Sequence, residues 1–180
     1  MTSWTIRKIE KKDNPAVAKL IRAVFDELEI PKVGTAYEDP YLDLMFEEYS
    51  KPRSVYFVVE QEGEVVGCAG IAPLANEKET ICELQKMYFL PATRGKGIGS
   101  EMMAICLQAA KEFGFEQCYL ETMPFMHSAQ KLYKKTGFEY QPEELYINEL
   151  ITEANTFFKI AQEKKNIKLT FHLSLFNYVI

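Results

Sequence analysis

The sequence has few of the residues that build metal sites and disulfide frameworks. Its 180 residues include two histidines and four cysteines. The cysteines are Cys68, Cys82, Cys106 and Cys118. Because they lie far apart and form no Cys-x-x-Cys pair, they indicate neither a metal knuckle nor a disulfide framework, and we expect them to be buried as small apolar residues. The two separated histidines, without a cysteine or carboxylate cluster, give no metal site.

Long apolar runs and a surplus of positive charge are also lacking. No stretch approaches the length that spans a bilayer. Residues Met1 to Asn14 alternate apolar with charged residues, whereas a secretory signal needs a continuous apolar core. The 21 basic and 26 acidic residues give a net charge of -5, which is the wrong sign for steering a nucleic acid. We expect a cytoplasmic protein without nucleic-acid or membrane partners.

The composition that is present suits a globular protein, with 47% hydrophobic and 26% charged residues. The length suits a single domain. In the first half, hydrophobic periodicity predicts a strand, two helices and a hairpin. These are Trp4–Glu10, a helix from Pro15 to about Leu28 with Asp13 or Asn14 as its cap, a short helix at Asp39–Tyr49, and strands at Ser54–Gln61 and Glu64–Pro73. The intervening Glu62-Gly63 is a hairpin signal.

The second half alternates strands and helices, which indicates an α/β or α+β protein with one mixed sheet. The expected elements are strands at Thr80–Leu90 and Phe115–Thr122, helices from the following glycine-rich turn to Phe113 and at Phe125–Thr136, an extended segment from Phe138, a helix over Leu145–Ala161, and a strand from Ile167. We predict a core at residues 1–142 and a C-terminal helix-strand extension at residues 143–180, packed on the same domain.

A glycine-rich turn between a predicted strand and helix is the strongest functional signal. It consists of Arg94, Gly95, Lys96, Gly97, Ile98, Gly99 and Ser100. Successive main-chain N–H groups with little side-chain obstruction, at the positive end of a helix dipole, form a cradle for an anion. Arg94 and Lys96 add mobile positive charge, so a pyrophosphate suits the turn better than a lone carboxylate.

Two other phosphate-binding loops do not fit this spacing. A Walker A loop requires a lysine after its last glycine, and no lysine follows Gly99. The dinucleotide fingerprint requires a third glycine where Ser100 stands, and it follows the first strand of its fold, whereas this turn lies in the middle of the chain.

The turn and a second motif together resemble the GNAT acetyltransferase superfamily. Before the turn stands a strand ending in Leu84-Gln85-Lys86-Met87-Tyr88-Phe89-Leu90-Pro91, and after it comes Ala129-Gln130-Lys131-Leu132-Tyr133-Lys134-Lys135-Thr136-Gly137-Phe138. The resemblance implies a mixed, mostly antiparallel central sheet flanked by helices. It also implies that acetyl-coenzyme A is bound by the backbone of residues 94–100, with the pantetheine arm adding to the strand at Met87, Tyr88 and Phe89.

The resemblance also suggests which side chains perform the chemistry. An alkylamine is mostly protonated at neutral pH, so a base must remove its proton before it attacks. Glu83 matches the strand position where family members place that base, and Glu121 is the second candidate. The alternative for both is a solvated surface carboxylate. Tyr133 matches the tyrosine that protonates the departing thiolate, and a main-chain N–H near Met87–Phe89 would polarise the acetyl carbonyl.

Three features depart from the family pattern or stay open. Met126 stands where an asparagine is common; Ser128 or His127 can substitute for it, although Ser128 also reads as an N-cap. The C-terminal extension is either a packing element or a lid or homodimer contact. The aromatics of the early helices can line an acceptor pocket or fill the core. They are Tyr37, Tyr41, Phe46 and Tyr49.

The sequence therefore predicts an N-acetyltransferase that moves an acetyl group from acetyl-coenzyme A to a primary amine of a small molecule or amino acid derivative. The alternative is a non-catalytic acyl-coenzyme A sensor or scaffold.

Overall fold

The structure is a computed structural model, and it describes residues 3–140, 155–159 and 168–174. The chain divides by its internal contacts into two compact units. Unit 1 comprises residues 1–73 and 84–109, and unit 2 comprises residues 74–83 and 110–180. The boundary predicted at residue 142 rests on the sequence pattern and stays a prediction.

Unit 1 contains four neighbouring strands in the order β1-β2-β3-β4. They are β1 (Trp4–Lys8), β2 (Val55–Gln61), β3 (Glu64–Pro73) and β4 (Ile81–Phe89), whose first three residues belong to unit 2. The pairs β1–β2 and β2–β3 are antiparallel. Between β2 and β3, Glu62 has φ 54° and Gly63 has φ 83°, the two positive values that a two-residue hairpin turn requires. The predicted hairpin is confirmed.

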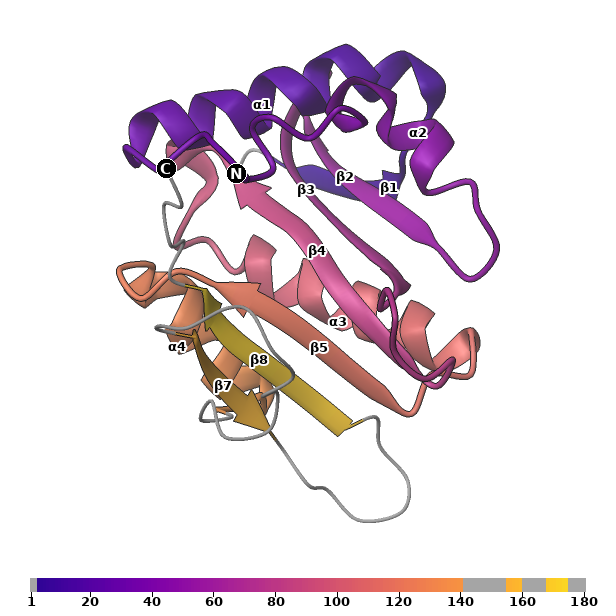
Figure 1. The fold of residues 1–180 in the computed structure, drawn as a ribbon. Coiled ribbons are helices and arrows are strands. Elements are labelled where there is room, and N and C mark those ends of the chain that lie inside the picture. Colours follow the sequence, from indigo (N-terminus) through magenta and orange to yellow (C-terminus); the bar gives the residue numbers. More distant parts are fainter. Residues whose placement is uncertain (1–2, 141–154, 160–167, 175–180) are drawn as a thin grey trace. The chain divides into compact units, whose positions relative to one another are not determined.

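Helix α1 (Asn14–Glu27) packs against β3 in unit 1 (Figure 1). Its inward stripe is buried, with exposed fractions of 0% for Val17 and Ile21 and 2% for Phe25, and each such side chain stabilises the fold by roughly 1.5–3 kcal/mol. The turn η1 (Lys11–Asp13) precedes it, and no side chain caps the helix. The Asp13 carboxylate instead accepts hydrogen bonds from Arg7 at 2.6 and 2.9 Å.

The second predicted helix is shorter and begins later than expected. It consists of a 3-10 turn, η2 (Leu42–Leu44), followed by α2 (Met45–Glu48). Tyr41 and Leu44 are 52% and 46% exposed, so neither belongs to the inward face of this segment. Leu42 is fully buried in their place. A 3-10 turn has three residues per turn instead of 3.6, so it shifts which residues face inward.

Two helical segments follow β4, of which the second, longer one was predicted. They are η3 (Pro91–Thr93) and α3 (Ile98–Glu112). The side chains of Ile98, Met102 and Cys106 are at most 1% exposed, which marks the inward face of α3. The helix ends at Gly114, with φ 78°.

Unit 2 contains a mixed sheet. Its strands are the first residues of β4 together with β5 (Gln117–Thr122), β6 (Glu139–Tyr140), β7 (Asn155–Lys159) and β8 (Lys168–Ser174). Strand β5 is parallel to β4 at Ile81–Glu83 and parallel to β8, and β7 lies antiparallel beside β8 (Figure 1). Helix α4 (His127–Thr136) ends at Gly137, which is left-handed with φ 104°. Parallel and antiparallel pairs with flanking helices confirm the α/β (α+β) class.

The C-terminal extension differs from its prediction. The helix expected over Leu145–Ala161 is wrong where the structure describes it, because Asn155–Lys159 forms strand β7. This stretch contains Thr156, Phe157 and Phe158, residue types that favour strands, and pairing with β6 and β8 outweighs the helical spacing of the apolar residues. The rest of the expected helix lies outside the described residues. The predicted terminal strand is confirmed as β8.

The expectations drawn from scarce residue types can now be compared with the described residues. All four cysteines are free and buried, as predicted. Within residues 3–140, 155–159 and 168–174, no group of three His, Cys, Asp or Glu side chains converges to hold a metal ion. None of the helices in this part of the chain is long and apolar enough to span a bilayer.

Candidate active site

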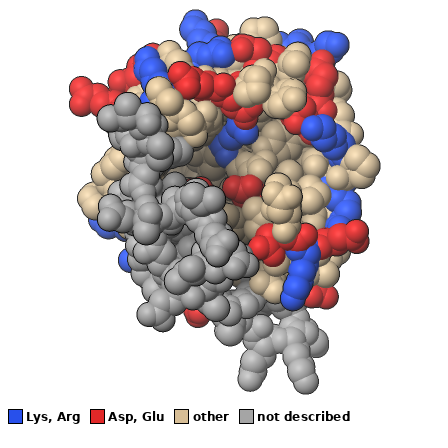
Figure 2. Space-filling model, viewed as in Figure 1, with Lys and Arg blue, Asp and Glu red and all other residues tan. Residues whose placement is uncertain are grey.

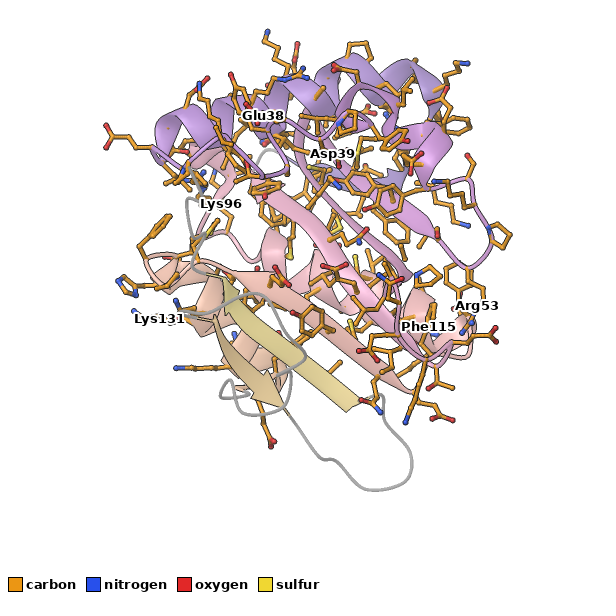
Figure 3. The ribbon with its side chains drawn as sticks, in the orientation of Figure 1. Glu38, Asp39, Arg53, Lys96, Phe115 and Lys131 are labelled. Atoms are coloured by element: carbon orange, nitrogen blue, oxygen red, sulfur yellow. The ribbon has the colours of Figure 1, made fainter. Side chains whose placement is uncertain are left out.

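The glycine-rich turn of unit 1 lies between β4 and α3, where Figure 3 labels Lys96. Gly95 and Gly97 have φ 74° and 90°, values that side-chain-bearing residues rarely adopt. A Cβ atom at either position would meet nothing within 4 Å. The two glycines are therefore needed for backbone direction, and the surface above them is open to a ligand.

The main-chain N–H groups of Ile98 and Gly99 in this turn lie outside the hydrogen bonds of α3. The carbonyl of Gly97 accepts from the N–H groups of Ser100 and Glu101 at 3.0 and 3.2 Å, so Gly97 stands at the N-cap position. The N–H groups of Ile98 and Gly99 consequently have no acceptor within the helix. These donors, at the positive end of a 15-residue helix, suit a diphosphate.

Arg94 does not provide the mobile positive charge expected from the sequence. Its Nη1 and Nη2 atoms donate to the two carboxylate oxygens of Glu27 at 2.7 and 2.6 Å, and its Nε donates to the carbonyl of Phe89 at 2.9 Å. The guanidinium thus ties the turn to the end of α1 and to β4. The main-chain N–H of Arg94 is also engaged, because it donates to the carbonyl of Pro91 at 3.2 Å.

The charge on α1 is also balanced. On the face shown in Figure 2, basic and acidic side chains are interspersed over this helix. Arg22 pairs with Asp43, and Asp26 pairs with Lys32, each at 2.6 Å. The cradle therefore relies on local main-chain donors more than on a broad positive field.

Strand β4 presents main-chain groups on the edge away from β3. The N–H of Leu90 donates to the carbonyl of Val66 on β3 at 3.0 Å. Since successive residues of a strand alternate in direction, the N–H groups of Met87 and Phe89 point to the opposite edge. Within the described residues, β4 pairs with β5 at Ile81–Glu83. An extended chain could therefore add to β4 at Met87–Phe89.

A backbone irregularity in β4 was not anticipated from the sequence. Lys86 has φ 49° in the middle of the strand, a value that costs a residue with a side chain about 1–2 kcal/mol. Its carbonyl accepts a hydrogen bond from the Tyr56 hydroxyl at 2.8 Å, and its ammonium pairs with Asp39 at 2.8 Å. These contacts come from residues far away in the sequence, so no local sequence signal marks the bulge.

Tyr133 in unit 2 lies on the buried side of α4 and is 6% exposed. Burial raises the pKa of Tyr133 to about 12, while a hydrogen bond with the Thr122 side chain opposes this shift. Its ring lies against Phe138, with 6.0 Å between centroids. The hydroxyl therefore keeps its proton at neutral pH, as a proton donor must.

The two candidate bases share one face of the unit 2 sheet. Glu83 on β4 is the register partner of Tyr119 on β5, and in-register residues of parallel strands point to the same face. Glu121 lies two residues further along β5, and its carboxylate accepts a hydrogen bond from the Tyr119 hydroxyl at 2.7 Å. Thr122, which contacts Tyr133, points to the other face by the same alternation. The structure thus groups Glu83 with Glu121 and places Tyr133 on the other face.

The residues before α4 differ from the capping expected of them. Met126 is the N-cap, and Ser128 lies in the first turn with an exposed side chain. The expectation that Ser128 caps the helix is therefore wrong. The Gln130 side chain instead orders this loop by donating to the carbonyls of Met123 and Pro124 at 3.1 and 2.7 Å.

The early aromatics of unit 1 divide between surface and interior. Tyr41 is exposed, whereas Tyr49 is 7% exposed and donates its hydroxyl to Oε1 of Gln85 at 2.6 Å. Tyr37 packs beside Phe25. The ring of Phe25 also packs against that of Tyr88 on β4, with 5.5 Å between the ring centroids. This aromatic set therefore reaches β4 from the α1 side.

These features define a class of protein. An anion cradle follows the C-terminal end of a strand, and the same strand offers main-chain donors along one edge. This arrangement suits a nucleotide diphosphate joined to an extended amide-bearing arm, which is the form of an acyl-coenzyme A.

Comparisons with known proteins agree with this class. The family model described as "Acetyltransferase (GNAT) family" matches residues 21–138 of this chain. An Escherichia coli protein described as "Uncharacterized N-acetyltransferase YjgM" is 48% identical over 139 residues, covering 77% of this chain and 83% of its own. The chain therefore belongs to the GNAT acetyltransferase family and is an acetyl-coenzyme A dependent N-acetyltransferase.

Solved structures show the same fold. A GNAT acetyltransferase from Staphylococcus aureus Mu50 aligns with a TM-score of 0.71 at 19% identity, covering 83% of this chain and 95% of that one. A predicted acetyltransferase from Clostridium acetobutylicum, solved with acetyl-CoA, aligns with a TM-score of 0.65 at 22% identity, covering 81% and 96%. Acetyl-coenzyme A is thus bound by a protein of the same fold.

Proposed function

We propose that this N-acetyltransferase acetylates a primary amine of a small molecule or amino acid derivative by direct attack on the thioester. Tyr133 is the general acid. Glu83, with Glu121 as the second candidate, is the general base, and it acts through water because both glutamates point to the face of the unit 2 sheet opposite to Tyr133. The observation that carries the proposal is the placement of the Tyr133 hydroxyl, on the buried side of α4 and in a hydrogen bond with the Thr122 side chain at the end of β5, where it is a protonated donor at neutral pH.

The cradle and the edge of β4 fit acetyl-coenzyme A. The main chain of Gly95–Ser100 would hold the diphosphate, and Met87–Phe89 would bind the pantetheine arm as an added strand. Since the cradle follows the C-terminal end of β4, an arm that runs back along the strand brings its acetyl end towards Lys86. The exposed side chain of Ser128 is a further candidate contact for the coenzyme.

The chemistry balances with these groups. The base removes a proton from the ammonium form of the acceptor, and the neutral nitrogen forms a bond to the acetyl carbon. The carbon-sulfur bond breaks, and Tyr133 gives its proton to the departing sulfur. The nitrogen of the adduct then loses its second proton to leave the neutral amide, and this proton returns to Tyr133 through solvent. The main-chain N–H of Met87, which points to the open edge of β4, would stabilise the carbonyl oxygen as it becomes negative.

An amine panel tests this proposal directly. Purified protein is incubated with acetyl-coenzyme A and a broad set of small amines and amino acid derivatives, and release of coenzyme A thiol is followed. We expect turnover with at least one amine and a fall in kcat of about 100-fold for Tyr133→Phe. Thr136→Val, which removes another hydroxyl from α4, is the control for a lost hydroxyl on this helix.

The outcome also separates the two candidate bases. Glu83→Gln should lower kcat at neutral pH and recover part of it at high pH, where free amine is abundant. Glu121→Gln should have the smaller effect. Turnover that is unchanged in Tyr133→Phe would exclude it as the general acid, and the opposite ranking of the two glutamates would assign the base to Glu121.

A further inference from the structure

We propose that Tyr56 is a positioning residue: its hydroxyl holds the bulge of β4 at Lys86 and thereby aims the N–H groups of Met87 and Phe89 at the pantetheine arm. The inference rests on the proposed function of this edge. Tyr56 lies on β2, which β3 separates from β4 in the strand order. Its effect would be transmitted through the main chain of Lys86.

The bulge requires something to hold it. Lys86 adopts φ 49°, whereas strand residues have strongly negative values. A lysine has no intrinsic preference for this conformation, unlike glycine or asparagine. Because residues after the bulge alternate in direction, the conformation at Lys86 decides towards which edge the N–H groups of Met87 and Phe89 point.

The Tyr56 hydroxyl is placed to supply that restraint. It donates to the Lys86 carbonyl at 2.8 Å, and the thiol of Cys68 approaches the same oxygen at 3.7 Å. Tyr56 is 1% exposed, and burial raises its pKa well above the ordinary value, so the hydroxyl remains a donor. Breaking this bond would leave polar atoms unsatisfied in the interior, which makes the restraint strong.

The Tyr56 ring is itself fixed by close packing. Tyr56 is the register partner of Gly70 on β3. A Cβ atom at Gly70 would lie 2.2 Å from Cδ2 of Tyr56 and 2.7 Å from Cε1 of Tyr49. The two rings pack on each other with centroids 4.6 Å apart. The absence of a side chain at Gly70 therefore lets the Tyr56 ring cross β3 and reach β4.

A second contact holds the same residue from its side chain. The Lys86 ammonium pairs with Asp39, which Figure 3 labels, and both side chains are about one-fifth exposed, at 20% and 23%. This pair restrains the side chain and leaves the peptide plane to Tyr56. The two restraints can therefore be separated by substitution.

The first experiment compares two ligands by calorimetry. Coenzyme A has both the diphosphate and the arm, whereas ADP has the diphosphate alone. We expect Tyr56→Phe to weaken coenzyme A about tenfold and to leave ADP within about twofold, because only the arm uses the edge of β4. Thr136→Val is the matched control. It also removes a hydroxyl that donates to a main-chain carbonyl, that of Leu132 at 2.8 Å, and it should change the affinity for neither ligand.

The second experiment asks whether the backbone conformation itself is responsible. Lys86→Gly and Lys86→Ala both remove the ammonium, but only glycine adopts positive φ without cost. In the Tyr56→Phe background, Lys86→Gly should restore coenzyme A affinity to within about threefold of wild type, whereas Lys86→Ala should not. Equal affinities of the two double variants would overturn the inference.

If Tyr56→Phe fails to fold, Lys86→Val tests the same point with Tyr56 intact. A β-branched residue resists positive φ, so coenzyme A should bind about tenfold more weakly than to Lys86→Ala while ADP binding is unchanged. Equal binding by these two variants would overturn the inference. A wild-type protein that binds coenzyme A but is indifferent to Tyr56→Phe would overturn the inference alone, whereas a wild type without affinity for coenzyme A would overturn the proposed function as well.

Discussion

The two units differ in which atoms are proposed to act on acetyl-coenzyme A. In unit 1 these atoms are main-chain N–H groups, at Met87–Phe89 and at Gly95–Ser100. The side chains of Tyr56 and Arg94 restrain this backbone by donating hydrogen bonds to the carbonyls of Lys86 and Phe89. In unit 2 the acting atoms belong to side chains, with Tyr133 on a helix and the two glutamates on strands.

This difference determines what mutations can reveal. A carboxylate or hydroxyl in unit 2 is removed by a single substitution, and the proposed mechanism predicts that kcat then falls. A main-chain donor in unit 1 cannot be removed by replacing its side chain. It can only be moved, through strain or packing, so variants of unit 1 should change stability and coenzyme affinity together.

The largest expected effect is on the packing of unit 1. In Gly70→Ala the new methyl would overlap the rings of Tyr56 and Tyr49, so we expect the free energy of unfolding to fall by about 3 kcal/mol in urea titrations. Gly63→Ala is the control, because its φ of 83° is strained but a Cβ would meet nothing within 4 Å; it should cost about 1 kcal/mol. Equal costs would show that the ring packing around Gly70 yields easily.

The next effect concerns Tyr133 in unit 2. Its folded pKa of about 12 lies above its unfolded value near 10, so below about pH 10 both states keep the proton. As pH rises from about 10 to 12, the unfolded chain loses its proton first, and wild type should lose about 2 kcal/mol of stability relative to Tyr133→Phe. Chemical unfolding of both proteins, at pH 9 and near pH 12, measures this difference in the free energy of unfolding. A constant difference between them would mean that the hydroxyl is solvated.

A smaller effect is expected in the cradle. Gly97→Ala forces a Cβ into a conformation with φ 90°, and the turn should rearrange to relieve it. We expect acetyl-coenzyme A to bind about tenfold more weakly in calorimetry, for a cost of about 1.4 kcal/mol. Gly114→Ala is the matched control, because Gly114 also has a positive φ of 78° and open space around a Cβ but lies outside the cradle. Unchanged affinity in Gly97→Ala would contradict a main-chain cradle at this turn.

The smallest effect should come from the ion pair between Glu27 and Arg94. Each side chain is 35% exposed, and exposed pairs contribute at most about 1 kcal/mol. Glu27→Gln releases the Arg94 charge beside the cradle, so acetyl-coenzyme A should bind about twofold more tightly at low salt, with no difference at high salt. Asp43→Asn, which releases Arg22 on the same helix, is the control. Weaker binding in Glu27→Gln would show instead that the ion pair is needed to hold the glycine-rich turn in its binding conformation.

Local signals predicted much of the fold and the cradle. The Glu62-Gly63 hairpin, the glycine that ends α4 and the strand-turn-helix around Gly97 depend on residues close in sequence, and each is found where expected. The helix over Leu145–Ala161 was predicted on the same kind of signal and is wrong at Asn155–Lys159, because pairing with β8 is a long-range effect that periodicity does not register.

The candidate site shows the same limit. Tyr133 was identified through its motif, but the bulge at Lys86 depends on Tyr56, which lies 30 residues earlier in the chain. The Arg94 guanidinium was expected to be mobile, whereas its partner Glu27 lies 67 residues away. Contacts at such separations leave no pattern in a single sequence, so both restraints required the structure.

The buried cysteines should interfere little with an assay that detects the thiol of released coenzyme A. All four thiols are buried, and burial raises the pKa of Cys68 to about 12, so that the reactive thiolate is scarce there at neutral pH. Disulfide reagents that colour on contact with free coenzyme A should therefore react slowly with the native protein. Rapid colour before any acceptor is added would report unfolding, which gives each kinetic run its own internal check on the integrity of the sample.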